Sequence, residues 1–348
     1  MKIRSLVSMT AALLVLLAGC TPAEESAERQ FFAMDTVMSV KVSGPKGEKA
    51  VEAVCSEISR LDALFSRTDP DSDISRLNAA AGSGTWTTLS GETAEVLTMA
   101  RAYAEETGGA FDVTIAPVMD AWGFGTAEET YQVPDGETLQ TLLPLVDSEK
   151  LTMGEDGTSA RLELAGMEAD LGGIAKGYAA DRAVSLLEEA GITSALLNLG
   201  TSTISLVGSK ADGSPWRVAV RDPADESGTL CVLELSDCAL STSGGYERYF
   251  EEDGQVYHHI LDPKTGAPAQ SGLSSVTVVT EQGTDADVWS TALYVMGTEK
   301  ALDFWRQEGG FECILCQADG TVLVTEGLEG KLNTEESGDG YTFEIVRR

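Results

Sequence analysis

The fold depends on residues 169–181, which have the sequence ADLGGIAKGYAAD. The preceding residues, 161–170, are predicted to form a strand that ends at Asp170. Apolar residues at helical spacing predict a helix over residues 175–189. Between these two elements, Gly172 and Gly173 allow a sharp turn and a close approach of the backbone to a ligand.

This turn has the properties of an anion-binding site. The first residues of a helix have free backbone N–H groups and the positive end of the helix dipole, and both attract negative charge. Lys176 adds a mobile cation at the same point. A Gly-Gly pair between a strand and a helix is also common as a purely structural turn. The turn alone therefore leaves the structural and the functional interpretation open.

The N-terminus predicts export and lipid anchoring. Two basic residues, Lys2 and Arg4, precede an apolar run over residues 11–18. This pattern is typical of a signal peptide, here residues 1–19, and the run is too short to span a bilayer permanently. Small residues directly before Cys20 resemble the lipidation site of bacterial lipoproteins; the alternative is an ordinary signal peptide with an incidental cysteine.

We accordingly expect three regions in the chain. Residues 1–19 are expected to be the lipoprotein signal peptide, residues 20–29 the lipidated Cys20 with a polar tether, and the remaining residues are long enough for one large domain or two. The protein is expected at the extracytoplasmic face of the bacterial cell membrane, held there by lipid rather than by a spanning helix.

The net charge limits the kinds of molecule that the protein can bind. A formal charge of −32 at pH 7 argues against nucleic acid and against binding of anionic lipid through surface charge. A phosphate-containing ligand then requires a metal ion or a local cation. The apolar content of 43% is enough for a sizeable core.

The cysteines do not indicate a metal site. Five follow Cys20, and two of them, Cys313 and Cys316, have the C-x-x-C spacing of redox and zinc motifs. Residues 311–323 are predicted to form two strands with a turn at Asp319-Gly320. On a strand, residues three apart point to opposite faces, which favours buried or edge cysteines over a redox site. Export permits disulfides, but the sequence assigns none.

Strands and helices are mixed without a strict βαβ order, which predicts an α+β fold of sheets covered by helices. Besides those above, the predicted helices are 49–64, a short one capped by Ser72, 91–106, 136–143, 285–296 with a cap at Thr284, and 301–308. The predicted strands are 31–42, 194–200, 202–207 paired with 216–220, 230–235, 239–246, 256–261, 274–280 and 341–346.

Two oxygen-bearing side chains share one face of the predicted helix 285–296. Asp287 and Thr291 are four residues apart and lie near its N-terminus. A carboxylate and a hydroxyl are hard ligands suited to Mg²⁺, which takes few protein ligands. A backbone carbonyl in the Gly172-Gly173 turn is a candidate third ligand. The alternative is an aspartate that is favoured there only by the helix dipole.

The two histidines of the chain are adjacent. His258 and His259 lie on a predicted strand and so face opposite ways, which leaves at most one of them for a given site. Histidine is the side chain best suited to take a hydroxyl proton near neutral pH. A purely structural histidine at a strand end is the alternative.

Six segments in order resemble the ApbE family, the FAD:protein FMN transferases, many of which are lipoproteins. The resemblance runs from about residue 31 to about residue 343. It implies that residues 30–348 form one large catalytic domain with an ApbE-like, T-fold-related fold. The segments are 34–36 (MDT), 73–78 (DISRLN), 109–112 (GAFD), 170–178 (DLGGIAKGY), 259–266 (HILDPKTG) and 286–292 (ADVWSTA).

The resemblance implies a magnesium-dependent enzyme that splits FAD, transfers FMN to a Thr or Ser hydroxyl of a partner protein and releases AMP. Its metal ligands would be the carbonyl of Gly173 with Asp287 and Thr291, and its general base would be His259. The implied FAD contacts are Met34, Thr68, Ala110, Phe111, Asp112, Asp170, Lys176, Leu261 and Ser290.

Two departures from the family pattern stand out. Thr68 occupies a position where relatives often carry an aromatic residue, and residues 198–202 (NLGTS) replace the usual NLGGN or NLGGD. The expected partner is an acceptor flavoprotein of an extracytoplasmic or membrane redox system, not nucleic acid. Two alternatives remain: hydrolysis of FAD to FMN and AMP, and a non-enzymatic lipoprotein that binds FAD.

Overall fold

The computed structural model describes residues 26–125 and 130–348. Its centre is a nine-stranded sheet in the order β1-β2-β6-β7-β10-β13-β14-β15-β17, antiparallel throughout except for the last pair. The strands are β1 (Ser26–Ala33), β2 (Thr36–Ser43), β6 (Ser194–Leu199), β7 (Thr203–Gly208), β10 (Cys238–Gly244), β13 (Leu273–Thr280), β14 (Glu312–Gln317), β15 (Thr321–Thr325) and β17 (Thr342–Val346).

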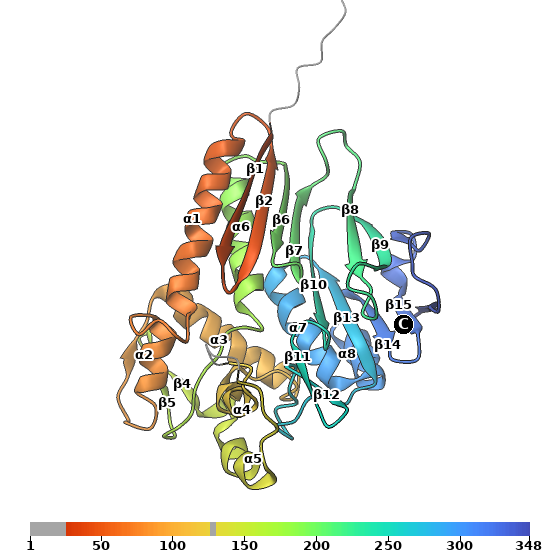
Figure 1. The fold of residues 1–348 in the computed structure, drawn as a ribbon. Helices are drawn as coiled ribbons and strands as arrows, with labels where there is room; N and C mark the ends of the chain where they lie inside the picture. Colours follow the sequence, from red (N-terminus) through yellow and green to blue (C-terminus); the bar gives the residue numbers. More distant parts are fainter. Residues whose placement is uncertain (1–25, 126–129) are drawn as a thin grey trace, which may run out of the picture.

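Helices cover one face of this sheet, with α1 and α6 beside β1, β2 and β6, and α7 and α8 farther along (Figure 1). These helices are α1 (Gly47–Phe65), α6 (Ala175–Glu189), α7 (Gly283–Met296) and α8 (Thr298–Glu308). Their apolar faces and the sheet enclose the larger hydrophobic core, which includes the fully buried Ile58, Leu187 and Val276.

A second, smaller core lies on the opposite face. There a three-stranded sheet in the order β16-β9-β8 packs on the central sheet. Its strands are β8 (Trp216–Arg221), β9 (Thr229–Leu235) and β16 (Leu332–Asn333). Strand β14 separates the two cores: Cys313 belongs to the larger one and Cys316 to the smaller. The two cysteines therefore face opposite ways, as predicted, and the cysteines of the described residues are free thiols.

Smaller elements gather below the central sheet in Figure 1. The helices are α2 (Asp73–Ala79), α3 (Gly91–Glu106), α4 (Ala116–Trp122) and α5 (Gly136–Leu142) with the 3-10 turns η1 (Val113–Ile115), η2 (Leu143–Leu145) and η3 (Ser148–Lys150); η4 (Glu326–Leu328) follows β15. The strands are β3 (Thr87–Thr88), β4 (Leu151–Met153) and β5 (Ser159–Leu162), and the hairpin β11 (Tyr249–Glu252) with β12 (Gln255–His258). The observed α+β architecture agrees with the prediction.

Several predicted elements are confirmed at their boundaries. Helix α3 begins at Gly91 and ends at Glu106, because Ser90 accepts a hydrogen bond from the Thr93 N–H at its start and two glycines follow its end. Ser72 caps α2 in the same way, by accepting from the Ser75 N–H at 3.0 Å.

Four predictions are wrong. Strand β5 ends at Leu162, so residues 163–170 lead to the glycine turn as an irregular segment. Residues 31–42 belong to two strands, because Met34 and Asp35 adopt positive φ angles of 49° and 57° and form the turn of a hairpin. Strand β8 pairs with β9 and not with β7. Thr284 lies inside α7, whose N-cap residue is Gln282.

The predicted signal peptide, residues 1–19, and Cys20 lie outside the described residues. Residues 26–29, expected in the tether, instead form the first half of β1, where Ala27 is buried. In the part of the chain that the structure covers, no helix combines the length and the apolarity that crossing a membrane requires.

Candidate functional site

The site is built where α6 crosses α7. A Cβ atom at Gly177 would lie 2.3 Å from the carbonyl oxygen of Gly283 and 2.8 Å from the Cβ atom of Asp287. Only glycine fits at this contact, so Gly177 lets the two helices approach closely. The close approach brings the Asp287 side chain against the first turn of α6.

Asp287 is a buried carboxylate that has only neutral hydrogen-bond donors. Its residue is 5% exposed, and its Oδ2 atom accepts the Gly177 N–H at 3.0 Å. Its Oδ1 atom accepts the hydroxyls of Thr203 at 3.1 Å and Ser241 at 3.2 Å. Among the described residues, no Lys, Arg or His nitrogen is paired with it. A buried negative charge without a cationic partner is costly, which makes this a suitable place for a cation.

A series of hydroxyl groups joins Asp287 to Thr291. The Ser290 hydroxyl donates to the Asp287 carbonyl at 3.0 Å and lies 2.9 Å from the Ser243 hydroxyl. The Ser243 hydroxyl is in turn 3.2 Å from the Thr291 hydroxyl. Strand β10 thus lines one side of the site and α7 the other. The structure brings together the predicted metal ligands Asp287 and Thr291 and the predicted FAD contact Ser290.

The donor set fits Mg²⁺. The candidate ligands are one carboxylate, one hydroxyl and the carbonyl of Gly173, which lies just before α6, four residues ahead of the Gly177 N–H that binds Asp287. Mg²⁺ prefers such hard oxygen ligands and commonly uses only one or two carboxylates. The described residues contain no group of three or more His, Cys, Asp or Glu side chains that would form an all-protein cage.

The glycine turn is held by a cluster of charged residues. Asp170 accepts the Gly172 N–H at 2.6 Å with one oxygen and faces the Arg67 guanidinium at 3.2 Å with the other. Arg67 is also paired with Asp120 and Glu168, each at 2.8 Å, and its side chain is 13% exposed. One buried arginine therefore ties the turn to the end of α1 and to α4.

The segment after α3 packs against the same turn. A Cβ atom at Gly173 would lie 3.0 Å from the ring of Phe111, so the ring and the glycine are matched in shape. Ala110 and Phe111 are both buried. Asp112 accepts hydrogen bonds from Thr114 N–H at 2.8 Å and Ser148 N–H at 3.0 Å and so caps η1 and anchors the following loop.

The remaining predicted FAD contacts lie on different elements. Met34 is partly buried in the turn between β1 and β2, and Thr68 is exposed beside Ser66. Leu261 is buried in a third apolar cluster with Trp122. Lys176 is partly exposed, and its Nζ atom is 3.4 Å from the Gly172 carbonyl.

His259 follows directly after β12. Its backbone N–H donates to the Arg248 carbonyl at 3.0 Å, and its Nδ1 atom is 3.2 Å from the same oxygen. Burial lowers the pKa of His259 to about 4, and the positive charges of Arg248 and Lys176 act in the same direction. The imidazole is therefore neutral at pH 7 and lies within electrostatic reach of the first turn of α6.

His258 has a separate environment. Its ring makes an edge contact with Tyr294 at 5.5 Å, and its Nε2 atom is 3.5 Å from the Tyr294 hydroxyl. A Cβ atom at Gly245 would lie 2.9 Å from both side chains, so the turn after β10 closes over them. The predicted strand ends at His258, so His259 lies just beyond it, and His258 has the contacts of a packed structural residue.

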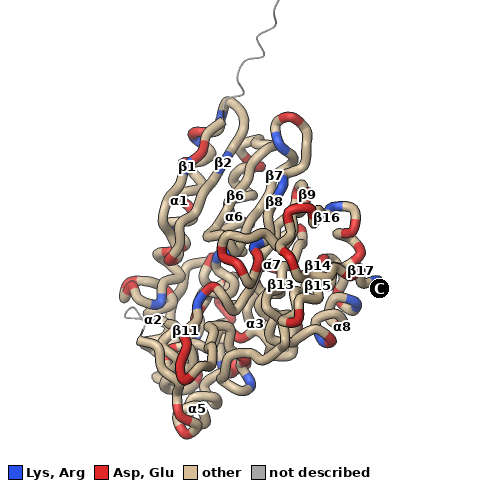
Figure 2. Tube along the Cα trace, turned by 45° about the vertical axis from the view of Figure 1, so that its right-hand side comes forward, with Lys and Arg blue, Asp and Glu red and all other residues tan. Residues whose placement is uncertain are grey.

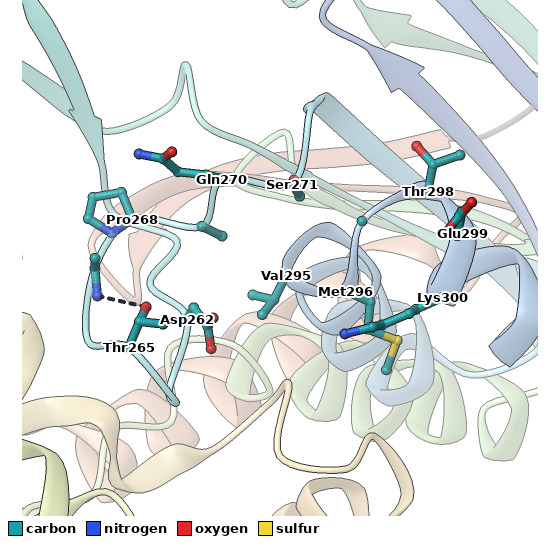
Figure 3. Close-up of a pocket in the computed structure, with 13 residues that line it drawn as sticks. Asp262, Thr265, Pro268, Gln270, Ser271, Val295, Met296, Thr298, Glu299 and Lys300 are labelled. Carbon is teal, nitrogen blue, oxygen red and sulfur yellow. Dashed lines mark hydrogen bonds between the residues drawn. The ribbon is translucent and has the colours of Figure 1, made fainter.

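A pocket of roughly 640 Å³ lies at the other end of α7. Figure 3 shows loop residues Thr265 to Ser271 on one side of it and Val295, Met296 and Lys300 on the other. Val295 is eight residues from Asp287, about 12 Å along the helix. None of the predicted site residues lines this pocket, so it is distinct from the Asp287 site.

Three residues that position the site were not predicted from the sequence: Thr203, Arg67 and Gly177. Thr203 on β7 lies opposite Ser241 on β10. These two strands are far apart in the sequence, and a single sequence does not reveal that they pair. The small-residue run over residues 239–246 does carry a signal, because the hydroxyls of serine and threonine on one strand are suited to line a polar site. Ser241 and Ser243 belong to that run.

Comparisons with known proteins point to one family. A family model described as "ApbE family" matches residues 34–315. The FAD:protein FMN transferase of Salmonella typhimurium is 32% identical over 322 residues, 89% of this chain and 91% of that protein. The protein of the same name from Escherichia coli K12 is 32% identical over 271 residues, 77% of each chain.

Solved structures agree with these relatives. The ApbE protein from Thermotoga maritima has a TM-score of 0.81 and 32% identity, and covers 88% of this chain and 99% of its own. The flavin transferase ApbE from Vibrio cholerae has a TM-score of 0.79 and 28% identity, and covers 89% and 100% respectively. The order of segments, the fold and these matches lead to one conclusion: the chain belongs to the ApbE family.

Proposed function

We propose that this protein is an FAD:protein FMN transferase that requires Mg²⁺ and releases AMP. The observation that carries the proposal is Asp287 at the first turn of α6, a buried carboxylate that forms no ion pair with any residue the structure describes. Relatives named FAD:protein FMN transferase match over most of their length, which supports the same reaction here.

Asp287, Thr291 and the Gly173 carbonyl would hold the ion. When bound, Mg²⁺ supplies charge neutralisation at the phosphate oxygens, which favours displacement at phosphorus. The free N–H groups at the start of α6 and the Lys176 ammonium would add positive potential for the diphosphate of FAD. Without such local positive charge, a protein of net charge −32 would repel the substrate.

The transfer step is a displacement at phosphorus. The hydroxyl oxygen of an acceptor Ser or Thr forms a bond to the phosphorus of the FMN half of FAD. The bond from that phosphorus to the bridging oxygen breaks, and AMP leaves with the bridging oxygen. His259 takes the hydroxyl proton, for which a neutral imidazole is required. Its lowered pKa keeps the ring neutral at physiological pH.

Two of the predicted FAD contacts lie next to the glycine turn. Phe111 and Asp170 flank the turn directly, as their contacts with Gly173 and Gly172 indicate. We assign the same role to the other predicted contacts, which are Met34, Thr68, Ala110, Asp112, Lys176, Leu261 and Ser290.

We further propose that the protein acts at the extracytoplasmic face of the bacterial cell membrane, anchored by a lipid on Cys20. The basic residues and apolar run before Cys20 support this location. Its acceptor would then be a flavoprotein of an extracytoplasmic or membrane redox system.

Product analysis tests the reaction. The purified protein is incubated with FAD and Mg²⁺, with and without membrane proteins from a host that lacks its own transferase. We expect AMP release and an acceptor whose Ser or Thr carries the added mass of FMN. EDTA should abolish both products. FMN and AMP without a modified protein would instead indicate a hydrolase, and FAD binding without AMP a non-enzymatic binding protein.

A further inference from the structure

The backbone is paired on both sides of His259. Before it, the ladder of β11 and β12 continues one step past its last strand pair, because the His259 N–H donates to the Arg248 carbonyl at 3.0 Å. After it, the Ala269 N–H donates to the Ile260 carbonyl at 2.9 Å. The main chain of His259 is therefore held in place, and its catalytic geometry depends on what fixes the side chain.

The Arg248 carbonyl also engages one nitrogen of the His259 ring. The Nδ1 atom lies 3.2 Å from this oxygen. A carbonyl oxygen only accepts hydrogen bonds, so a hydrogen bond here requires that Nδ1 carries the proton. The oxygen has two lone pairs and serves the backbone N–H and Nδ1 together. Nε2 is then the ring nitrogen with a free electron pair.

The second ring nitrogen remains available. In the part of the chain that the structure describes, no group forms a hydrogen bond with Nε2 of His259, and this atom is not one of the buried nitrogens left without a partner. The His259 side chain is only half-buried, so Nε2 is open to an incoming hydroxyl. His258 differs, because its Nδ1 atom is buried without a partner.

Phe124 contacts the imidazole from the side. Its ring centre lies 6.4 Å from that of His259, and the planes of the two rings meet at 65°, which is an edge contact. Phe124 is only 5% exposed, and it also packs on Phe250 at 5.8 Å and on Tyr131 at 5.4 Å. A ring that is packed on several sides moves little, so Phe124 gives the imidazole a fixed neighbour.

Two glycines hold Phe124 in place. Gly123 has a φ angle of 84°, and a Cβ atom there would overlap the Thr130 carbonyl oxygen. A Cβ atom at Gly125 would lie 2.6 Å from Nη1 of Arg67. Only glycine fits at these positions, and Arg67 is the residue that also ties down the glycine turn. The proposed general base and the glycine turn therefore share one support.

The surroundings of His259 keep it neutral. Burial lowers its pKa most, the hydrogen bond to the Arg248 carbonyl acts in the opposite direction, and the charges of Arg248, His258 and Lys176 lower the pKa further. The acidic residues 251–253, the red segment beside the β11 label in Figure 2, lie at the far end of the hairpin from His259. Because burial has the largest effect, removal of a ring packed on His259 should raise its pKa.

We propose that Phe124 is a positioning residue for His259: together with the Arg248 carbonyl, its ring holds the imidazole so that Nε2 takes the proton of the acceptor hydroxyl. This inference rests on the proposed transferase function. The proton passes from the hydroxyl oxygen to Nε2 as that oxygen bonds to phosphorus, and the imidazolium releases it to water after AMP has left. Nδ1 keeps its own proton throughout, on the Arg248 carbonyl.

The tautomer of His259 is tested without turnover. The sequence contains two histidines, so protein labelled with nitrogen-15 histidine gives two sets of ring signals, which His259→Gln assigns. At about pH 7.5, where the imidazole is neutral, we expect proton–nitrogen NMR correlations to show a protonated Nδ1 and an unprotonated Nε2 for His259. A protonated Nε2, or an even mixture of the two tautomers, overturns the proposal.

Paired variants test the role of Phe124. In Phe124→Ala water reaches the imidazole, so the pKa of His259, followed by the same NMR signals, should rise from about 4 toward 6.5, by at least about 1. Phe250→Ala removes a ring of the same cluster that, among the described residues, has no ring contact with His259, and should leave the pKa near 4. Phe124→Tyr keeps the ring and should keep the low pKa. An unchanged pKa in Phe124→Ala, or equal increases in both alanine variants, overturns the proposal.

Turnover separates this inference from the proposed function. At about pH 8, where the imidazole is neutral in every variant, kcat should fall at least about tenfold in Phe124→Ala and at least about threefold in the milder Phe124→Leu, while the KM for FAD stays near the wild-type value. An unchanged kcat in either folded variant would refute the positioning role and leave the transferase intact. Failure of the wild type to release AMP with any acceptor would refute the transferase, whereas the NMR signals would still report the tautomer.

Discussion

Two carboxylates at the crossing of α6 and α7 occupy nearly equivalent positions. Asp181 on α6 accepts from the first residues of α7, namely the N–H groups of Gly283 at 2.5 Å and Thr284 at 2.8 Å and the Thr284 hydroxyl. Asp287 on α7 accepts from Gly177 in the first turn of α6. Each aspartate thus lies at the positive end of the neighbouring helix.

The two sites differ in their donors. Asp181 binds two fixed backbone N–H groups at the start of α7, although burial still raises the pKa of its carboxyl group. Asp287 binds only one, and its other partners are the hydroxyls of Thr203 and Ser241, whose protons can rotate. Asp287 is buried and Asp181 half-buried, and the number of hydrogen bonds alone would not distinguish them. The kind of donor indicates that Asp181 holds the helices together and that Asp287 is ready to bind a cation.

Replacing Asp287 should have the largest effect. Asp287→Asn keeps an oxygen acceptor and the volume of the side chain, but removes the charge that would hold the metal. We expect the rate of FAD cleavage to fall at least about a thousandfold. The thermal unfolding midpoint should stay close to that of the wild type. A variant that keeps full activity would place the metal elsewhere.

Replacing His259 should have the next largest effect. His259→Ala should lower the transfer rate about a hundredfold or more, because the variant lacks the imidazole that takes the proton from the acceptor hydroxyl. FAD affinity, measured by flavin fluorescence, should not change. Equal losses of binding and rate would indicate a structural role instead.

The pH dependence gives a second test of His259. Its pKa is lowered to about 4 from the ordinary value of 6.5, so protonation removes the base only below neutral pH. The transfer rate should therefore hold through pH 6.5 and fall toward about pH 4. Because the unfolded state binds more protons in this window, folding stability should also decline as the pH falls through it. An acid limb centred at 6.5 would contradict this assignment.

Removing the rotatable donors should have a smaller effect. Thr203→Val and Ser241→Ala each take one hydrogen bond from Asp287 Oδ1 without changing its charge. Because such partners orient a metal ligand, we expect Mg²⁺ affinity to fall about 10–100-fold. Manganese titration by electron paramagnetic resonance measures this directly. The comparable change at the other carboxylate, Thr284→Val, should leave ion affinity unchanged.

Replacing Asp181 should have the smallest effect on activity. Asp181→Asn presents an amide N–H to a position that needs an acceptor, so we expect the unfolding free energy to fall by about 1–3 kcal/mol. Urea denaturation measures this loss. Below the unfolding transition, FAD cleavage should proceed at nearly the wild-type rate. A large loss of activity in a folded Asp181→Asn protein would erase the distinction between the two carboxylates.

The sequence predicted the local parts of this arrangement better than the non-local ones. Helix α3 was predicted to its terminal residues, since its cap and glycine stop lie in the adjacent sequence. Residues 31–42 were predicted as one strand, because alternation continues through a turn that lacks glycine. The prediction of a strand over residues 161–170 was also wrong, because β5 ends at Leu162, before a segment of charged and turn-forming residues.

In the candidate site, too, the sequence predicts local arrangements better than contacts between distant parts of the chain. Asp287 and Thr291 are separated by one helical turn, so their spacing alone placed them together. Their partners Thr203 and Ser241 come from strands whose pairing joins distant parts of the chain. Gly177 was present in the quoted stretch, but its role depends on the position of α7, which no local pattern specifies.

The proposed metal site at Asp287 is tested most directly by a crystal structure of the protein with Mn²⁺ and FAD. The ion is identified by its anomalous scattering. We predict a peak bound to the Asp287 carboxylate and the Thr291 hydroxyl at about 2.0–2.3 Å, next to the diphosphate. Two results would contradict the assignment of Asp287 as a metal ligand. In one, FAD is bound while the ion lies away from Asp287; in the other, the Asp287 carboxylate faces no phosphate.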